Sequence, residues 1–368
     1  MKNIAIIGAG SSGLLLSKKL SDVDGVQVYV FEKCKHVGTK LRASGGGKAN
    51  IFNTNIFPEC YNNPDFARAL LAQVSPDILK KEFEDMGLTM VSDEEGRVYP
   101  TSQYSQTMID ILWEPEKSNL HAELEYDVRK VRFENGKWRI NDYPVLFDNV
   151  VFATGTTANM IPKNRLGYNA FLTDFNLKFS DFQPSLVGFK IKNYPKSLSG
   201  CRAKVIASLY SQDELIHQEP GEVTFKDDGI SGIVILNLSA YYNRLSHKDG
   251  CYVELNFMYG NPDYDVDQHV KRFGSMKGIL HPKLNELYGK HPFNVKKYKF
   301  AIESLYDLAF AQVCHGGVDL SEIDENFALK RYPGAYITGE LLNIDGVCGG
   351  YNLFFAFASA LVVARELS

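Results

Sequence analysis

The first 32 residues of the chain constrain its fold more than any other segment. Residues 3–7 form a β-branched apolar run, and residues 11–20 carry apolar side chains at helical spacing. A second β-branched run at 26–31 ends in Glu32. A strand, a helix and a second strand in this order form a βαβ unit, whose strands lie parallel in one sheet. The sequence therefore predicts an α/β fold.

Three glycines occupy the turn between the first strand and the helix. Gly8 permits a tight turn, Gly10 lets the backbone approach a pyrophosphate, and Gly13 lets the helix pack closely on the strand. The helix start also offers free N–H groups to an anion. At the end of the second strand, Glu32 can accept hydrogen bonds from ribose hydroxyls and would repel a 2′-phosphate. The pattern predicts FAD or NAD rather than NADP; the alternative is an ordinary glycine turn.

Two distant segments favour FAD over NAD. Residues 153–155 end a strand in a small-residue turn that brings the backbone near a cofactor, although such a turn also occurs without one. Near the C-terminus, residues 339–352 contain a glycine-rich stretch that leads directly into an apolar helix. A helix N-terminus aimed at the N1 and O2 edge of a flavin would stabilise negative charge on the reduced ring. The alternative is a glycine-rich helix start that binds no ligand.

Composition limits the class of protein. With 368 residues, 45% hydrophobic and 23% charged, the chain is expected to be a globular enzyme of more than one domain. A net charge of −4 argues against nucleic-acid or membrane partners. The six cysteines show no close spacing, which favours reduced thiols and no metal site. Glycines interrupt the apolar N-terminal run, so we expect no signal peptide, and a cytoplasmic location.

Later segments suggest how the domains are arranged. Strands are predicted at 122–131, 137–140 and 145–153, the last being nearly all apolar and therefore central in the sheet. From about Pro184 the chain changes to short alternating segments typical of a β-rich domain. Residues 265–288 show weaker helical periods.

Four motifs resemble those of the YhiN/BaiN-type flavoproteins, which are NAD(P)/FAD-dependent oxidoreductases that include aminoacetone-oxidase-like members. The first is the glycine turn, and the second is the glycine-rich loop at 38–50 with Asn53 after it. The third comprises 221–222, 229–232 and 236–239, and the fourth comprises 316–318, 322–324 and 339–352. Together these matches run from residue 3 to about 360 of the sequence.

The resemblance implies a Rossmann-like FAD domain of the two-dinucleotide-binding-domain type, made from both chain ends. We expect this domain at 1–184 and 316–368, an inserted β-rich domain at 185–262, and a small helical domain with the return segment at 263–315. The glycine turn and these motifs together predict the cofactor contacts Gly8, Gly10, Ser12, Gly13, Glu32, Lys33, Lys40, Ser44, Gly45, Gly46, Gly47, Asn50, Val128, Ala153, Thr154, Gly155, Gly339, Glu340, Asp345, Gly349, Gly350, Tyr351 and Asn352.

The sequence departs from the family pattern at two places. Lys48-Ala49-Asn50 stands where many relatives have Arg-Cys-Asn, so a flavin–thiol relay at this position is excluded. Lys226-Asp227 replaces a Thr-His pair, which removes a neutral-pH acid/base group. The helical insert is also shorter, which implies a more open pocket.

These features predict an FAD-dependent oxidoreductase that exchanges hydride between flavin N5 and a small organic substrate held between the domains. Amine oxidase and enone reductase both remain open. No second strand-linked glycine fingerprint occurs, so NAD(P)H is expected only as a transient electron donor. A non-catalytic flavin-binding redox sensor is the alternative. His315 and Tyr351 are possible acid/base groups, and neither is assigned as catalytic; the oligomeric state is open.

Overall fold

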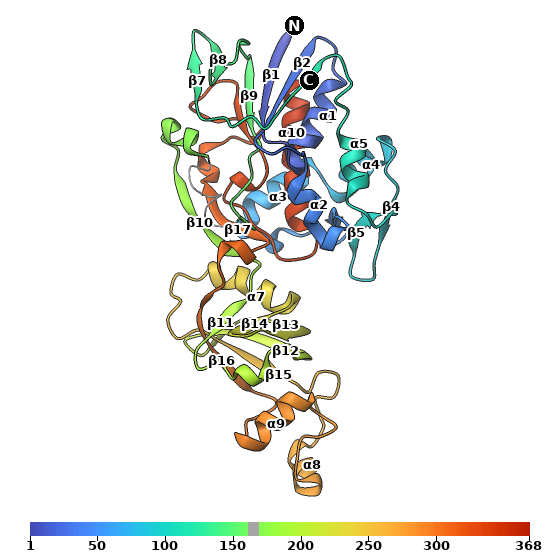
Figure 1. The fold of residues 1–368 in the computed structure, drawn as a ribbon, viewed down its shortest axis with the longest axis vertical. Coiled ribbons are helices and arrows are strands. Elements are labelled where there is room, and N and C mark those ends of the chain that lie inside the picture. The colour runs from blue at the N-terminus through green and yellow to red at the C-terminus, as the bar shows by residue number, and fades with distance from the viewer. Residues whose placement is uncertain (161–168) are drawn as a thin grey trace. The chain divides into compact units, whose positions relative to one another are not determined.

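The computed structural model describes residues 1–160 and 169–368 (Figure 1). The chain folds into two compact units. Unit 1 contains Met1–Thr157, Pro162–Phe182 and His315–Ser368, so it is built from both chain ends. Unit 2 contains Ala158–Ile161 and Gln183–Cys314. The division of unit 2 into a β-rich and a helical domain stays a prediction.

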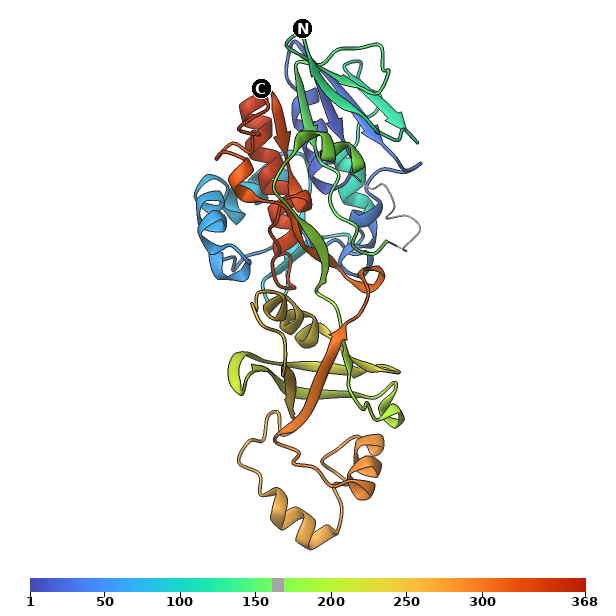
Figure 2. The same ribbon diagram turned by 90° about the vertical axis from the view of Figure 1, so that its left-hand side faces the viewer.

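A five-stranded parallel sheet forms the centre of unit 1. Its order is β18-β9-β1-β2-β6, and every neighbouring pair is parallel. The strands are β1 (Lys2–Ile7), β2 (Val26–Glu32), β6 (Leu120–Leu124), β9 (Asn149–Phe152) and β18 (Ala335–Ile337). The helices α1 (Ser11–Ser21) and α10 (Tyr351–Leu367) pack against each other beside this sheet, as Figure 2 shows. The parallel sheet predicted from the first 32 residues is confirmed.

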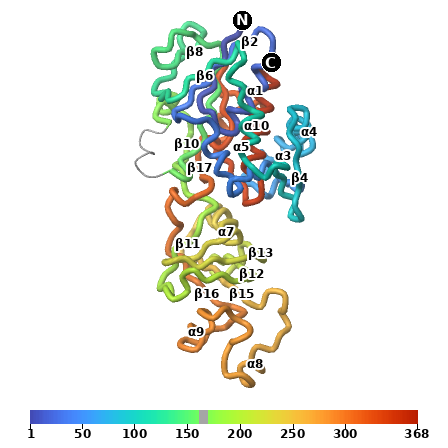
Figure 3. The backbone as a smooth tube through the Cα atoms, turned by 45° about the vertical axis from the view of Figure 1, so that its right-hand side comes forward, coloured from blue at the N-terminus to red at the C-terminus, as the bar shows by residue number. Residues whose placement is uncertain are grey.

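The strand predicted at 122–131 is shorter in the structure. It ends with β6 at Leu124, because Glu125 adopts a left-handed φ of 56°. The chain then turns back onto the end of β2, where the Tyr126 N–H donates to the Glu32 carbonyl oxygen at 2.9 Å. Both chain termini lie at the same end of unit 1 (Figure 3), and Lys2 Nζ donates to the Leu367 carbonyl oxygen at 3.0 Å.

Smaller elements complete unit 1. Unit 1 also contains helices α3, α4 and α5 and a three-stranded antiparallel sheet of order β3-β5-β4. Strands β7 and β8 form a hairpin, and β10 pairs with β17 in a two-stranded sheet whose strands each include residues of both units. The bounds are α2 (Thr39–Ala43), η1 (Ser44–Gly47), β3 (Phe52–Asn53), α3 (Pro64–Gln73), α4 (Pro76–Asp85), β4 (Met90–Ser92), β5 (Arg97–Pro100), α5 (Gln106–Leu112), β7 (Val131–Glu134), β8 (Lys137–Ile140), β10 (Phe179–Ser185), β17 (Val313–Val318) and η7 (Gly339–Leu341).

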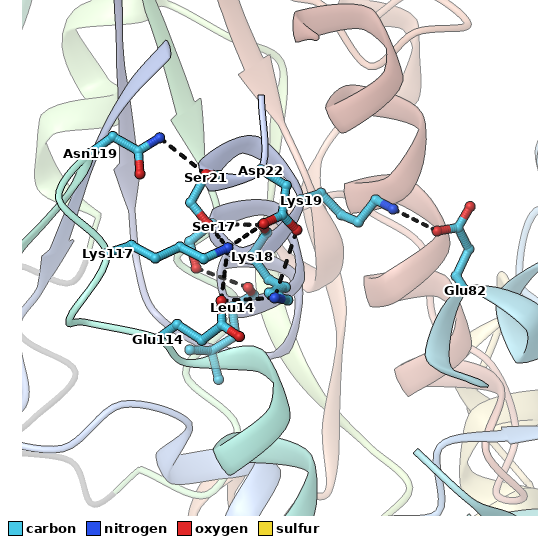
Figure 4. Close-up of polar contacts among 10 residues, drawn as sticks. All are labelled: Leu14, Ser17, Lys18, Lys19, Ser21, Asp22, Glu82, Glu114, Lys117 and Asn119. Carbon is cyan, nitrogen blue, oxygen red and sulfur yellow. Dashed lines mark hydrogen bonds and ion pairs between the residues drawn. The ribbon is translucent and has the colours of Figure 1, made fainter. Parts of the chain in front are cut away.

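A network of charged side chains fixes helix α1, which begins at the glycine turn (Figure 4). Lys18 and Lys117 both place Nζ 2.8 Å from Oε2 of Glu114. On another side of the helix, Lys19 Nζ lies 2.8 Å from Oε2 of Glu82 in α4. These ion pairs join α1 to the segments around α4 and α5, so they help to hold the turn in place.

Unit 2 is a closed six-stranded barrel with helices at its two ends (Figures 1 and 2). The strand order is β11-β14-β13-β12-β15-β16, and all pairs are antiparallel. Helix α7 lies at one end of the barrel and α8 and α9 at the other. The bounds are β11 (Phe189–Ile191), β12 (Arg202–Ser211), β13 (Glu214–Phe225), β14 (Gly229–Ser231), α7 (Ile233–Asn243), β15 (Tyr252–Asn256), α8 (Val266–Phe273), α9 (Pro282–Lys290) and β16 (Tyr298–Leu305). Among the described residues, no helix combines the length and the apolar character needed to cross a membrane.

Candidate active site

The glycine turn between β1 and α1 has the geometry of an anion cradle. A Cβ on Gly8 would lie 2.5 Å from the Ala153 carbonyl oxygen, and one on Gly13 would lie 2.0 Å from the Gly8 carbonyl oxygen. A Cβ on Gly10 would meet no atom within 4 Å. Gly10 is the N-cap of α1, and no side chain caps this helix start. The turn is therefore tightly packed on the sheet side and open where the helix N–H groups begin, which suits a pyrophosphate.

Glu32 is fixed beside this turn by two backbone donors. The N–H of Ala9 donates to Oε2 and the N–H of Cys34 donates to Oε1, each at 2.8 Å. A carboxylate oxygen accepts more than one hydrogen bond, so both oxygens keep capacity for ribose hydroxyls. Lys33 and Val128 lie near the same strand end: Lys33 Nζ is 3.4 Å from Asp127 Oδ1, and Val128 packs on the unit 1 core.

The strand-end turn after β9 lies next to the glycine turn. Ala153 touches both Gly8 and Gly13, because β9 is the parallel neighbour of β1. Gly155 has a φ of 68°, and a Cβ there would meet open space. Thr156, which the sequence did not single out, accepts a hydrogen bond from Lys40 Nζ at its carbonyl oxygen at 2.7 Å.

The predicted flavin loop contains three consecutive left-handed glycines in η1. Gly45, Gly46 and Gly47 have φ values of 57°, 67° and 87°. A Cβ on Gly45 would lie 2.7 Å from the Asn50 backbone nitrogen, whereas a Cβ on Gly46 or Gly47 would meet open space. The Ser44 hydroxyl donates to the Leu41 carbonyl oxygen at 2.7 Å. The loop therefore exposes backbone without side chains on one side, as a flat ring system requires.

A lysine and a glutamate stand opposite each other between these segments. Lys40 Nζ lies 3.9 Å from Oε2 of Glu340, which sits in η7 directly after β18. Burial raises the pKa of the Glu340 carboxyl above its ordinary value, and the Lys40 ammonium opposes this shift. The preceding Gly339 reaches the glycine turn, since a Cβ there would lie 3.0 Å from Ser12 Oγ.

The last predicted segment, 345–352, folds back onto the flavin loop. Asn352 closes it: its Oδ1 accepts from the Gly346 N–H at 2.8 Å, and its Nδ2 donates to the Gly346 carbonyl oxygen at 2.9 Å. Gly349 and Gly350 have φ values of 134° and 101°. With its amide oriented to satisfy its neighbours, Asn50 accepts from the Gly350 N–H at 3.1 Å. The Tyr351 carbonyl oxygen accepts from the Tyr61 hydroxyl at 2.8 Å.

His315 and Asp345 form a pair within unit 1. His315 Nδ1 lies 2.8 Å from Asp345 Oδ1, and the Asp345 side chain is only 1% exposed. The backbone N–H of Asp345 donates to Oδ1 of Asn62 at 3.0 Å, so two distant segments position this aspartate. The sequence did not predict Asn62, because its partner is 283 positions away.

The predicted residues from both chain ends thus meet at the carboxyl end of one parallel sheet. Thr338, at the end of β18, adds a buried hydroxyl oxygen with no hydrogen-bond partner in the described part of the chain. The open position at Gly10, the acceptor at Glu32 and the glycine backbone of η1 fit the phosphate, ribose and ring portions of FAD.

Comparison with known proteins identifies the family. A model described as the HI0933-like protein Rossmann domain matches residues 2–366. The chain is 28% identical to a 3-dehydro-bile acid delta(4,6)-reductase of Clostridium scindens, over 99% of this chain and 98% of that protein. It is 26% identical to a ribosomal RNA dihydrouridine synthase of Escherichia coli, over 98% of this chain and 97% of that protein.

A solved structure supports the fold. The 3-ketosteroid delta1-dehydrogenase from Sterolibacterium denitrificans, in complex with 1,4-androstadiene-3,17-dione, aligns over 100% of this chain and 99% of that chain. The TM-score is 0.54 at 11% identity, which shows a shared fold. The Rossmann-type fold and the family resemblance expected from the sequence are confirmed. The chain therefore belongs to the HI0933-like family of Rossmann-fold flavoprotein oxidoreductases, and it is an enzyme.

Proposed function

We propose that this enzyme holds FAD at the carboxyl end of the unit 1 sheet and reduces a carbon–carbon double bond conjugated to a carbonyl group. FAD binding is supported mainly by the turn before α1. At this turn Gly10 leaves open space, and the Glu32 carboxylate lies beside the turn. The reaction type is supported by two relatives, the delta(4,6)-reductase of 3-dehydro-bile acids and the dihydrouridine synthase. Both reactions saturate a ring double bond that lies next to a carbonyl.

The residues of this chain contribute to the reaction by binding and orienting the cofactor. When bound, FAD supplies the two electrons of the reduction. The N–H groups and positive dipole end of α1 favour the pyrophosphate, and Glu32 accepts hydrogen bonds from the ribose. The backbone of η1, which Asn50 connects to Gly350, would hold the ring by its N–H groups. The site residues expected from the sequence remain proposals in these roles.

We take a small cyclic enone as the substrate class and NAD(P)H as a transient electron donor. An amine oxidase would instead remove electrons from its substrate and pass them to oxygen. Neither of the two relatives compared above is named as an oxidase. The direction of electron flow therefore separates these possibilities.

A second candidate substrate is a uracil base in RNA, and a local charge pattern favours it. Between Gln268 and Lys299 the chain has eight lysines and arginines and a single acidic residue, Glu286. In this segment Phe273 is 57% exposed, with the Arg272 guanidinium 5.1 Å from its ring centre. Exposed rings among basic side chains suit single-stranded nucleic acid. The net charge of −4 of the whole chain does not reveal the positive charge of this segment.

The proposal is tested by incubating the FAD-loaded protein anaerobically with NADPH or NADH and a set of cyclic enones, followed by mass spectrometry. The expected result is a product heavier than its substrate by two hydrogen atoms. Consumption of an amine with oxygen, and no reduction of any enone, would contradict it. A uridine-containing RNA in parallel reactions tests the second candidate. Lys271→Glu with Arg272→Glu should then abolish reduction of RNA and leave reduction of the enone unchanged.

A further inference from the structure

The His315–Asp345 pair gives unit 1 an oriented imidazole. The Nδ1 atom of His315 faces the buried Asp345 carboxylate at 2.8 Å, while the histidine side chain is 26% exposed. Since the Nδ1 edge is taken up by the carboxylate, the accessible edge of the ring carries Nε2. A carboxylate in this position fixes the ring orientation and keeps the proton on Nδ1.

One member of the pair, Asp345, lies on the segment that connects the two ends of the FAD cradle, and His315 contacts it from β17. This segment starts at Gly339, which approaches Ser12 in the glycine turn, and ends at Gly350, which bonds to Asn50 beside η1. Asp345 lies midway between these ends. The neighbouring strand β17 carries His315, and the Gly316 N–H donates to Oδ1 of Asn343 at 3.1 Å, which holds the strand against the segment.

We propose that His315 is the catalytic proton donor to the substrate and that Asp345 is its positioning residue. This inference rests on the proposed reduction of a conjugated double bond. That reduction adds two electrons and two protons. When bound, reduced FAD would supply both electrons and one proton, as a hydride to the carbon β to the carbonyl, so the α carbon would still need a proton.

His315 would supply the proton that the α carbon needs. The carbon–carbon π bond breaks, a C–H bond forms at the α carbon, and the Nε2–H bond of the doubly protonated ring breaks. The ring is left neutral with its remaining proton on Nδ1, hydrogen-bonded to Asp345. Solvent water then returns a proton to Nε2.

Two other side chains, Tyr61 and Glu340, are the competing candidates for the donor. Burial raises the pKa of the Tyr61 hydroxyl well above its usual range, and this hydroxyl is already committed to the Tyr351 carbonyl oxygen. Glu340 faces Lys40 and Thr156, whose carbonyl oxygen binds the same ammonium. Glu340→Gln therefore serves as the comparison for His315→Asn.

The test separates the two halves of the catalytic cycle. The FAD-loaded variants are reduced anaerobically with dithionite and mixed with 2-cyclohexen-1-one in a stopped-flow spectrometer. We expect His315→Asn to bind FAD and to accept electrons as the wild type does, but to be reoxidised by the enone about 10²- to 10⁴-fold more slowly. His291→Asn, on an exposed loop of unit 2, is the matched control and should behave as the wild type.

A second readout does not depend on flavin or on activity. In the ¹⁵N-histidine-labelled apoprotein, long-range ¹H–¹⁵N correlations should show His315 with a proton on Nδ1. In Asp345→Asn this preference should disappear, and enone-dependent reoxidation should fall as well. An unchanged imidazole signature in Asp345→Asn would remove the positioning role.

The outcomes separate a failure of the His315 donor role from a failure of the proposed enone reduction. Equal losses in FAD reduction and enone reoxidation for His315→Asn, or a loss in Glu340→Gln alone, would overturn His315 as the donor. A wild-type protein that no enone reoxidises would overturn the proposed function, and with it the donor role. The nuclear magnetic resonance result would still decide whether Asp345 orients the ring.

Discussion

At the residue scale, two glycines of one turn separate folding from cofactor binding. A Cβ at Gly13 would lie 2.0 Å from the Gly8 carbonyl oxygen, whereas one at Gly10 would meet no atom within 4 Å. Gly10 also has a φ of −81°, which alanine adopts without strain. We expect Gly13→Ala to lower the free energy of unfolding by about 1–3 kcal/mol. Gly10→Ala should change it by less than about 0.5 kcal/mol.

The Gly10→Ala and Gly13→Ala substitutions should therefore affect FAD binding for different reasons. In Gly10→Ala the added methyl would stand in the open space before α1, so FAD affinity should fall while the fold is kept. Denaturant unfolding of the apoprotein and FAD titration by fluorescence measure the two effects. A Gly10→Ala protein that binds FAD as tightly as the wild type would mean that the pyrophosphate does not occupy this turn.

Glu340 predicts a stability effect that depends on pH. Burial raises the pKa of its carboxyl in the folded chain, and Lys40 opposes the shift. Stability from the protonated form is fully present below the unfolded pKa, and it is lost as the pH rises through the folded pKa. Glu340→Gln should therefore stabilise the apoprotein at pH 7, and this gain should vanish in acid. Thermal unfolding of both proteins across this pH range measures the difference; a gain that grows in acid would contradict the sign.

At this scale the sequence pattern is informative where the constraint is local. Gly8 and Gly13 are required by steric contacts around one turn, so their spacing was sufficient to find them. The hydrogen bonds from Lys40 to Thr156 and from Asp345 to Asn62 join residues 116 and 283 positions apart. Such contacts depend on how separate elements pack, and the sequence pattern contains no signal for them.

At the element scale, the charged network around α1 predicts acid sensitivity. Hydrogen bonds from Lys117 and Lys18 lower the pKa of the Glu114 carboxyl (Figure 4). A lowered folded pKa contributes stability above the unfolded pKa, and this contribution is lost as the pH falls through the folded value. Glu114→Gln should thus be less stable than the wild type at pH 7 and equally stable at pH 2. Chemical denaturation at several pH values tests this, and a difference that persists at pH 2 would contradict it.

Helices and strands could be predicted where the pattern within their own sequence determines them. The β1-α1-β2 unit follows from hydrophobic spacing within 32 residues. The barrel of unit 2 did not follow, because its closure pairs β11 with β16, placing Phe189 opposite Leu305. The predicted strand at 122–131 was too long, because the left-handed Glu125 interrupts an otherwise strand-like run.

At the scale of the whole molecule, FAD should protect unit 1 selectively. A ligand that binds only the folded state at 100 times its Kd stabilises that state by about 2.7 kcal/mol. Hydrogen–deuterium exchange should therefore slow in three segments of unit 1, namely the glycine turn, α2 with η1, and residues 339–352. The barrel strands β12 and β13 should show no comparable change. Protection confined to unit 2 would place the cofactor outside the cradle described here.

A single anaerobic measurement tests the proposed reduction most directly. Purified protein is loaded with FAD, reduced with one equivalent of dithionite and mixed with a cyclic enone, while absorbance near ~450 nm, the oxidised flavin band, is recorded. If the enzyme reduces enones, the band should return without oxygen, at a rate that saturates with enone concentration. A protein that takes up no FAD, or one whose band returns only when oxygen is admitted, would contradict the proposed reduction.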